Sequence, residues 1–191
     1  MSSLDTEPED SPGPAWLRDA ERVDGAVYAA IAHTPTPALD AAMARLTHAA
    51  DYSRLWLAAA GIMAATGGAR GRRAAASGLA SVGVTAAVVN LGLKPLGGRR
   101  RPDRVAEQVP LERQARMPIS TSFPSGHSAA AFAFATGVGH VLPGVSVPLQ
   151  ALAAVVAYSR HHTRVQKPGD LLVGALCGTL LARHTAHAQD R

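Results

Sequence analysis

The feature that most constrains this chain of 191 residues is the way its charges gather in a few blocks, with long uncharged stretches between them. A membrane-crossing helix needs about 20 mostly apolar residues, with about 17 as a lower limit. Two stretches meet that limit, and three approach it once flanking side chains reach the membrane interface. The stretches are 55–69, 74–93, 125–142, 144–159 and 171–182. They predict an all-α, integral-membrane helical bundle of about five transmembrane helices.

Small residues favour close packing of these helices. Gly174 and Gly178 form a GxxxG pair, and Ala129, Ala133 and Gly137 recur at a spacing of four residues. A hydrophobic fraction of 47% excludes a disordered chain, and the single cysteine excludes a disulfide scaffold or a cysteine-based zinc site. The alternative, a soluble alanine-rich bundle, is the weaker interpretation because five such stretches are many for so short a soluble core.

The N-terminal quarter differs from the rest of the chain. Residues 1–20 are polar and contain three prolines, which predicts a disordered tail. Residues 21–50 have apolar side chains at helical spacing and predict amphipathic interfacial helices, broken at 34–37. Residues 51–185 are then the transmembrane domain, and 186–191 a short tail.

The net charge of +5 is unevenly distributed. The first 24 residues carry seven acidic and two basic side chains, whereas the remainder carries seven acidic and 17 basic ones. A basic body indicates an anionic partner, such as a lipid headgroup, a phosphorylated substrate or nucleic acid. Nucleic acid is disfavoured because the main basic cluster lies between two predicted membrane spans.

Two basic loops give conflicting signals for topology. The arginines at 70–73 lie in a short turn, which the positive-inside rule places in the cytoplasm. The loop 94–124 is then outside, although it is more basic. Basic residues that bind a ligand do not report membrane orientation. A ligand-binding site in 94–124 therefore explains why a strongly basic loop lies outside the cytoplasm.

Three segments with reactive side chains lie at the ends of the uncharged stretches. Lysine and arginine bind phosphate oxygens, a helix N-terminus offers free N–H groups to an anion, and histidine can protonate a leaving oxygen. Two membrane crossings separate the second and third segments, so all three can meet at one membrane face. The segments are KPLGGRRRP at 94–102, PSGH at 124–127 and SRHHTRVQKPGD at 159–170.

In order and spacing these segments resemble the three motifs of the PAP2 superfamily, the type 2 phosphatidic acid phosphatases related to vanadium haloperoxidases. The resemblance covers about residues 52–183. It implies that His127 protonates the leaving oxygen and that Asp170 orients the side chain at position 166. It implies no metal and no cofactor. The residues that it assigns to phosphate binding are Lys94, Arg101, Ser125, Gly126 and Arg160.

One position departs from the family pattern. Gln166 stands where the third motif has the histidine that attacks phosphorus and forms a phosphohistidine. A carboxamide nitrogen has no comparably basic lone pair, so Gln166 can hydrogen-bond phosphate but should not form that intermediate. His161 and His162 are nearby, but replacement by either is disfavoured because in-line attack tolerates little misplacement.

Three hypotheses follow. The first is a membrane phosphatase acting on a lipid phosphate or a prenyl (di)phosphate. The second is a pseudoenzyme that binds lipid phosphate, and the third is a structural membrane protein with a vestigial pocket, which the retained cations argue against. A haloperoxidase is disfavoured because that branch needs the missing histidine. We expect a bacterial inner-membrane location with an extracytoplasmic site, and Trp16 and Trp56 at the membrane interfaces.

Overall fold

The computed structural model describes residues 14–32, 36–97, 121–163 and 165–191, and within these ranges the regular elements are helical. Two short elements, η1 and η4, are 3-10 helices, and η2 is a π-helix. In chain order the elements are α1 (Ala15–Ala32), α2 (Pro37–Ala50), η1 (Asp51–Ser53), α3 (Arg54–Thr66), α4 (Gly68–Ala87), η2 (Val88–Leu93), α5 (Lys94–Gly97), α6 (Gly126–Val141), η4 (Pro143–Val145), α7 (Ser146–His162) and α8 (Pro168–Gln189).

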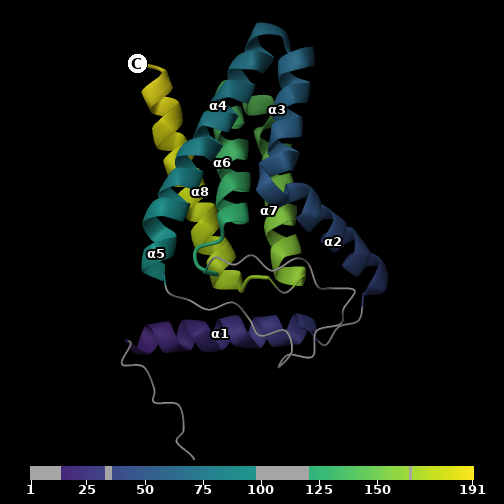
Figure 1. Ribbon diagram of the computed structural model, residues 1–191, viewed down its shortest axis with the longest axis vertical. Helices are drawn as coiled ribbons and strands as arrows, with labels where there is room; N and C mark the ends of the chain where they lie inside the picture. Colours follow the sequence, from purple (N-terminus) through teal and green to yellow (C-terminus); the bar gives the residue numbers. More distant parts are fainter. Residues whose placement is uncertain (1–13, 33–35, 98–120, 164) are drawn as a thin grey trace, which may run out of the picture.

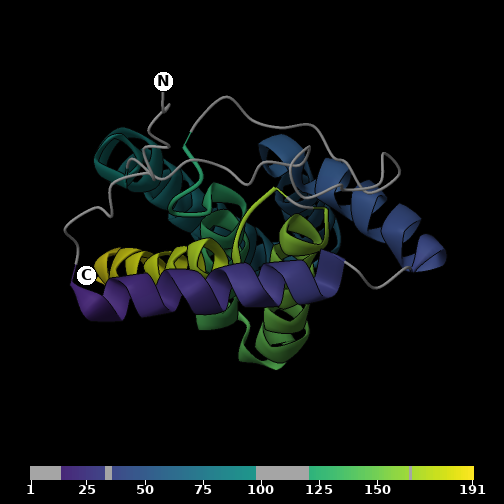
Figure 2. The same cartoon turned by 90° about the horizontal axis from the view of Figure 1, so that it is seen from below.

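Five helices form the bundle: α3, α4, α6, α7 and α8, each within or close to a predicted stretch (Figure 1). Helix α1 lies across one end of the bundle, as the view from below also shows (Figure 2). The C-terminal ends of α5 and α7 and the N-terminal ends of α6 and α8 face this same end. The described parts of the three motif segments therefore meet at one end of the bundle, as the crossing pattern predicts.

Hydropathy distinguishes one of these helices from the others. Among the described residues, the run Gly68–Leu96 alone is both long and apolar enough to cross a membrane: it has 29 residues, and an 18-residue window within it has a mean hydropathy of 1.6. The sequence also predicts a full-length span at 125–142, but α6 has 16 residues and begins at Gly126 because Ser125 serves as its N-cap.

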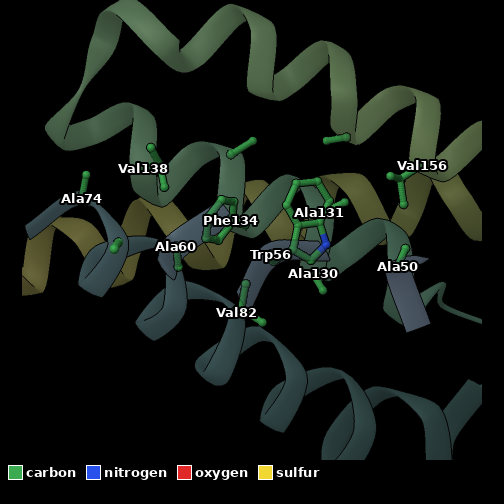
Figure 3. Packing of buried hydrophobic residues seen from close by; sticks show 13 residues of the cluster. Ala50, Trp56, Ala60, Ala74, Val82, Ala130, Ala131, Phe134, Val138 and Val156 are labelled. Carbon is green, nitrogen blue, oxygen red and sulfur yellow. The ribbon is translucent and has the colours of Figure 1, made fainter. Parts of the chain in front are cut away.

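Two aromatic rings lie at the centre of the bundle (Figure 3). The rings of Trp56 in α3 and Phe134 in α6 have centroids 5.2 Å apart, and Trp56 is only 1% exposed. The expectation that Trp56 sits at a membrane interface is therefore wrong. Its place on the face of α3 that packs against α6 cannot be read from its position near the start of an apolar stretch.

Helices α6 and α8 approach each other through the predicted GxxxG pair. A Cβ on Gly178 would lie 2.1 Å from the carbonyl oxygen of Ala129, and one on Gly174 would lie 2.5 Å from that of Ser125. Both distances are far below van der Waals contact, so only glycine permits this approach. The contact brings the start of α6 against the first turns of α8.

The N-terminal helices are attached to the same end of the bundle. Asp24 of α1 accepts a hydrogen bond from the backbone N–H of Gly169 at 2.7 Å, and Asp40 of α2 lies 2.7 Å from the Nε2 of His162. Helix α1 begins at Ala15, so the predicted tail is helical from that residue. The C-terminal tail also begins later than predicted, because α8 continues to Gln189.

Candidate active site

The N-terminus of α6 has the features of an anion-binding site. Ser125 is the N-cap, and its Oγ accepts a hydrogen bond from the N–H of Ser128 at 3.2 Å. The backbone amides of Gly126 and His127 come just before that of Ser128, in the first turn of α6, where N–H groups have no partner inside the helix. Together with the positive end of the helix dipole, such amides bind phosphate oxygens.

Lys94, the first residue of α5, extends its side chain to this helix start. The π-helical residues 88–93 separate α4 from Lys94, and such bulges are frequent at functional sites because they redirect the side chains that follow. The Nζ of Lys94 lies 3.5 Å from the point that a Cβ on Gly126 would occupy. Lys94, Asn90 and His127 line one cavity of about 300 Å³, whose other walls include Trp56 and Val89.

Gln166 is buried and is hydrogen-bonded at both ends of its carboxamide. Its Oε1 accepts from the Ser125 hydroxyl at 2.7 Å, and its Nε2 donates to the Ser122 carbonyl at 3.2 Å. The side chain is 2% exposed. Gln166 therefore joins the loop before α8 to the segment that leads into α6.

Asp170 is the third residue of α8, in the first turn of that helix, and lies close to Gln166. Its carboxylate accepts hydrogen bonds from the Ser122 hydroxyl and, at 3.1 Å, from the backbone N–H of Lys167. Its own carbonyl accepts the N–H of Ser125 at 3.0 Å. Asp170 and Gln166 thus share Ser122 as a partner, one through the hydroxyl and the other through the carbonyl.

A carboxylate that the sequence analysis missed completes the other side of the site. The Oδ1 of Asp51 lies 3.0 Å from the Nε2 of His127 and 3.5 Å from Nη1 of Arg160, which is 1% exposed. The hydrogen bond from His127 lowers the pKa of Asp51 below its usual range, and the charge of Arg160 acts in the same direction. The available signal was positional: Asp51 is the last acid before the first uncharged stretch, at the end where the motifs meet.

The structure thus brings together seven of the eight predicted positions, and the eighth, Arg101, lies outside the described residues. The two histidines considered as substitutes for the missing nucleophile have structural contacts. The Nδ1 of His161 lies 3.2 Å from the Gln166 carbonyl, and His162 pairs with Asp40. The positions brought together are Lys94, Ser125–His127, Arg160, Gln166 and Asp170.

The sequence was compared with models of known protein families. Residues 74–191, from the second turn of α4 to the end of the sequence, match the PAP2 superfamily. The chain belongs to this superfamily. All three motif segments of the PAP2 protein lie inside the matched range, which confirms the predicted membership.

Two solved structures share the fold of this PAP2 protein. A transmembrane PAP2 type phosphatidylglycerolphosphate phosphatase from Bacillus subtilis is 26% identical, with a TM-score of 0.68 over 90% of this chain and 87% of that one. LpxE from Aquifex aeolicus is 23% identical, with a TM-score of 0.66 over 85% of this chain and 94% of that one. No curated protein matches the sequence. The predicted class, an all-α integral-membrane helical bundle, is confirmed.

Proposed function

We propose that this PAP2 protein binds the phosphate group of a membrane lipid phosphate or prenyl (di)phosphate, and that Gln166 keeps its own phosphatase turnover slow. The observation that carries the proposal is the buried carboxamide of Gln166, bonded to Ser125 and Ser122 at the motif position of the nucleophile. Around it, the cations and helix amides that bind phosphate are retained.

A lipid substrate fits the outer surface of the bundle. Large apolar side chains are exposed along its helices, and on α8 Leu172, Leu176 and Leu180 are 62–67% exposed at a spacing of four residues. Exposed apolar patches of this kind favour a hydrocarbon environment over water. We therefore place helices α3 to α8 in the bilayer as the transmembrane domain, with α1 and α2 along the extracytoplasmic surface of a bacterial inner membrane.

The bound phosphate lies, in this proposal, at the start of α6. The amides of Gly126 and His127 and the ammonium of Lys94 contact its oxygens, and the Ser125 hydroxyl donates to them when it releases Gln166. The guanidinium of Arg160 offsets the charge that develops on the transferring group. Arg101 is assigned to the same role by its motif position.

The remaining groups fit a two-step displacement from which one member is missing. A histidine nitrogen at position 166 would form an N–P bond while the bond from phosphorus to the lipid oxygen breaks, and His127 would give that oxygen its proton. Water would then break the N–P bond and release inorganic phosphate. The amide of Gln166 cannot take the first step because its nitrogen lone pair is delocalised into the carbonyl.

The test is phosphate release and lipid-phosphate binding by purified wild type and Gln166→His in detergent micelles, with phosphatidate and a prenyl phosphate as probes. Wild type should bind both probes with little release. Gln166→His should release phosphate roughly 10³-fold faster, which corresponds to about 4 kcal/mol of barrier.

Gln166→Leu is the matched control because it also breaks both carboxamide hydrogen bonds but adds no nucleophile. It should stay as slow as wild type. Equal rates in wild type and Gln166→His would show that water or another group attacks phosphorus. If wild type binds no probe and Gln166→His stays inactive, the pocket is vestigial and the protein is structural.

A further inference from the structure

Asp51 lies outside the three motifs but contacts two motif residues at once. A single oxygen, Oδ1, approaches both the Nε2 of His127 and Nη1 of Arg160, while Oδ2 lies 3.4 Å from the Nδ1 of His48. The Asp51 side chain is 21% exposed and that of His127 is 22% exposed, so both are largely removed from water. Hydrogen bonds to charged groups are strongest under these conditions.

The backbone beside Asp51 is strained in a way that local burial does not explain. Tyr52 and Ser53 are consecutive non-glycine residues with positive φ, 53° and 59°, a conformation that side chains disfavour. The Tyr52 side chain is 74% exposed, so the turn does not serve to bury its ring. Such strain persists where the surroundings require it and is concentrated at functional sites. Here the turn lies between α2 and α3 and directs the preceding carboxylate toward α6 and α7.

On this geometry we infer that Asp51 is a positioning residue for proton transfer by His127. This inference rests on the proposed function, in which His127 protonates the leaving oxygen. A carboxylate that accepts a hydrogen bond from one ring nitrogen fixes the tautomer and the orientation of the imidazole. With Nε2–H directed at Asp51, the Nδ1 of His127 is the nitrogen that exchanges a proton with the substrate.

Charge gives Asp51 a second effect on the same ring. His127 faces the cations Arg160 and Lys94 in addition to Asp51, and Asp51 itself faces His48. The two cations disfavour a protonated imidazole, whereas the carboxylate favours it. Removing the charge of Asp51 leaves His127 beside two cations without the carboxylate that offsets them.

The kinetic test compares Gln166→His with Gln166→His/Asp51→Asn, using phosphatidate in detergent micelles over pH 5 to 9. The added Asp51→Asn substitution should lower kcat about tenfold or more. This is part of the rate enhancement of roughly 10²–10⁴-fold that a positioned general acid contributes. KM should change little, and the pH limb that reports the acid should move to lower pH. Asp51→Glu in the same background should recover part of the rate and of the pH profile.

A second readout requires no turnover. In wild-type protein with ¹⁵N-labelled histidines, the His127 ring should carry its proton on Nε2 at neutral pH, and Asp51→Asn should mix the two tautomers. Asp190→Asn is the matched control, because Asp190 forms a carboxylate–imidazole contact of 2.8 Å with His140 at the opposite end of the bundle. It should leave the His127 signals unchanged.

The two readouts separate the failure of this inference from the failure of the proposed function. An inactive Gln166→His with His127 signals that respond to Asp51→Asn rejects the proposed turnover and keeps Asp51 as the partner that orients His127. Unchanged His127 signals in Asp51→Asn overturn the inference whatever the activity. Tighter phosphate binding by Asp51→Asn also overturns it, because Asp51 would then be a competitor for the cations rather than a positioning residue.

Discussion

The two sides of the candidate site are built from different chemistry. On the side of Gln166, a neutral carboxamide and two serines join the loop before α8 to the start of α6. On the side of His127, the carboxylate of Asp51 lies within 3.5 Å of both the His127 imidazole and the buried guanidinium of Arg160. The Asp170 carboxylate on the Gln166 side accepts from neutral donors, the Ser122 hydroxyl and the Lys167 backbone N–H, whereas the Asp51 carboxylate on the His127 side faces a guanidinium. We call the two the neutral side and the charged side.

The difference indicates which half of a phosphoryl transfer the protein still supports. Stabilising the charge of the transferring group and protonating the leaving oxygen require cations and an acid, and both belong to the charged side. Attack on phosphorus requires an electron pair, which Gln166 does not offer. Three predictions test this division, from the largest expected effect to the smallest, and a fourth tests the packing that holds the two sides together.

The largest effect on phosphate release is expected from substituting Arg160 in the Gln166→His variant. The charge of Arg160 stabilises the transferring phosphoryl group, so it affects the rate only when a nucleophile is present to attack phosphorus. Adding Arg160→Ala to Gln166→His should remove the gain in phosphate release, a loss of about 10³-fold. Arg160→Lys in the same background keeps the charge but loses the two-pronged geometry, so it should retain an intermediate rate.

Stopped assays with radiolabelled phosphatidate measure these rates, and thermal unfolding in detergent checks that each variant folds. Full activity in folded Gln166→His/Arg160→Ala would place the transferring phosphate away from the charged side.

The neutral side should depend on the close approach of α8 to α6. Gly174→Ala places a methyl group 2.5 Å from the backbone carbonyl oxygen of Ser125, so α8 and the start of α6 must move apart at the residue whose hydroxyl bonds Gln166. We expect a loss of about 1–3 kcal/mol in unfolding free energy and weaker phosphate binding. Gly83→Ala is the matched control, since a Cβ there meets nothing within 4 Å. It should be neutral or slightly stabilising. Equal stability of the two variants in mixed-micelle unfolding would contradict the packing described for α6 and α8.

The sequence predicts the neutral side of the site better than the charged side. The spacing of Ser125, Gln166 and Asp170 follows from motifs at helix ends, and the GxxxG pair indicates which helices bring these ends together. The contact of Asp51 with His127 joins residues 76 positions apart and depends on a turn with positive φ at Tyr52 and Ser53. Tyrosine and serine are not residue types that favour positive φ, so no local sequence pattern predicts this turn or the direction of the Asp51 carboxylate.

The same limit applies to helix faces and helix ends. Apolar periodicity places α1 and α2 as separate amphipathic helices around the prolines, but it does not show that Asp24 and Asp40 fix them to α8 and α7. It likewise cannot tell that Trp56 faces inward, because every face of an alanine-rich helix is apolar. Long-range partners decide these features, and a single sequence does not contain them.

Double-mutant cycles should distinguish the two kinds of bonding directly. The coupling between Ser125→Ala and Gln166→Met should be about 1 kcal/mol, as for a neutral hydrogen bond, and it should not vary between pH 5 and 8. The coupling between Asp51→Asn and His127→Gln should be about 1.5–3 kcal/mol and should increase as the imidazole becomes protonated. Mixed-micelle unfolding measures both couplings, and pH-independent coupling of Asp51 with His127 would mean that this contact is also a neutral hydrogen bond.

The smallest effect is expected on stability in acid. The hydrogen bond from His127 lowers the pKa of Asp51 in the folded protein, so the stabilisation is present above the pKa of an unfolded aspartate, about 3.9, and is lost as the pH falls through the folded value. Between pH 5 and pH 3 the Tm of wild type should therefore fall more steeply than that of Asp51→Asn, which has no carboxylate to protonate at this position. Asp190→Asn is the control at the other end of the bundle, where the aspartate side chain is 55% exposed and water screens its contact with His140. Its profile should parallel that of wild type. If Asp51→Asn also parallels wild type, the folded protein does not hold Asp51 as an anion on His127, and the charged side of the site loses the group that distinguishes it from the neutral one.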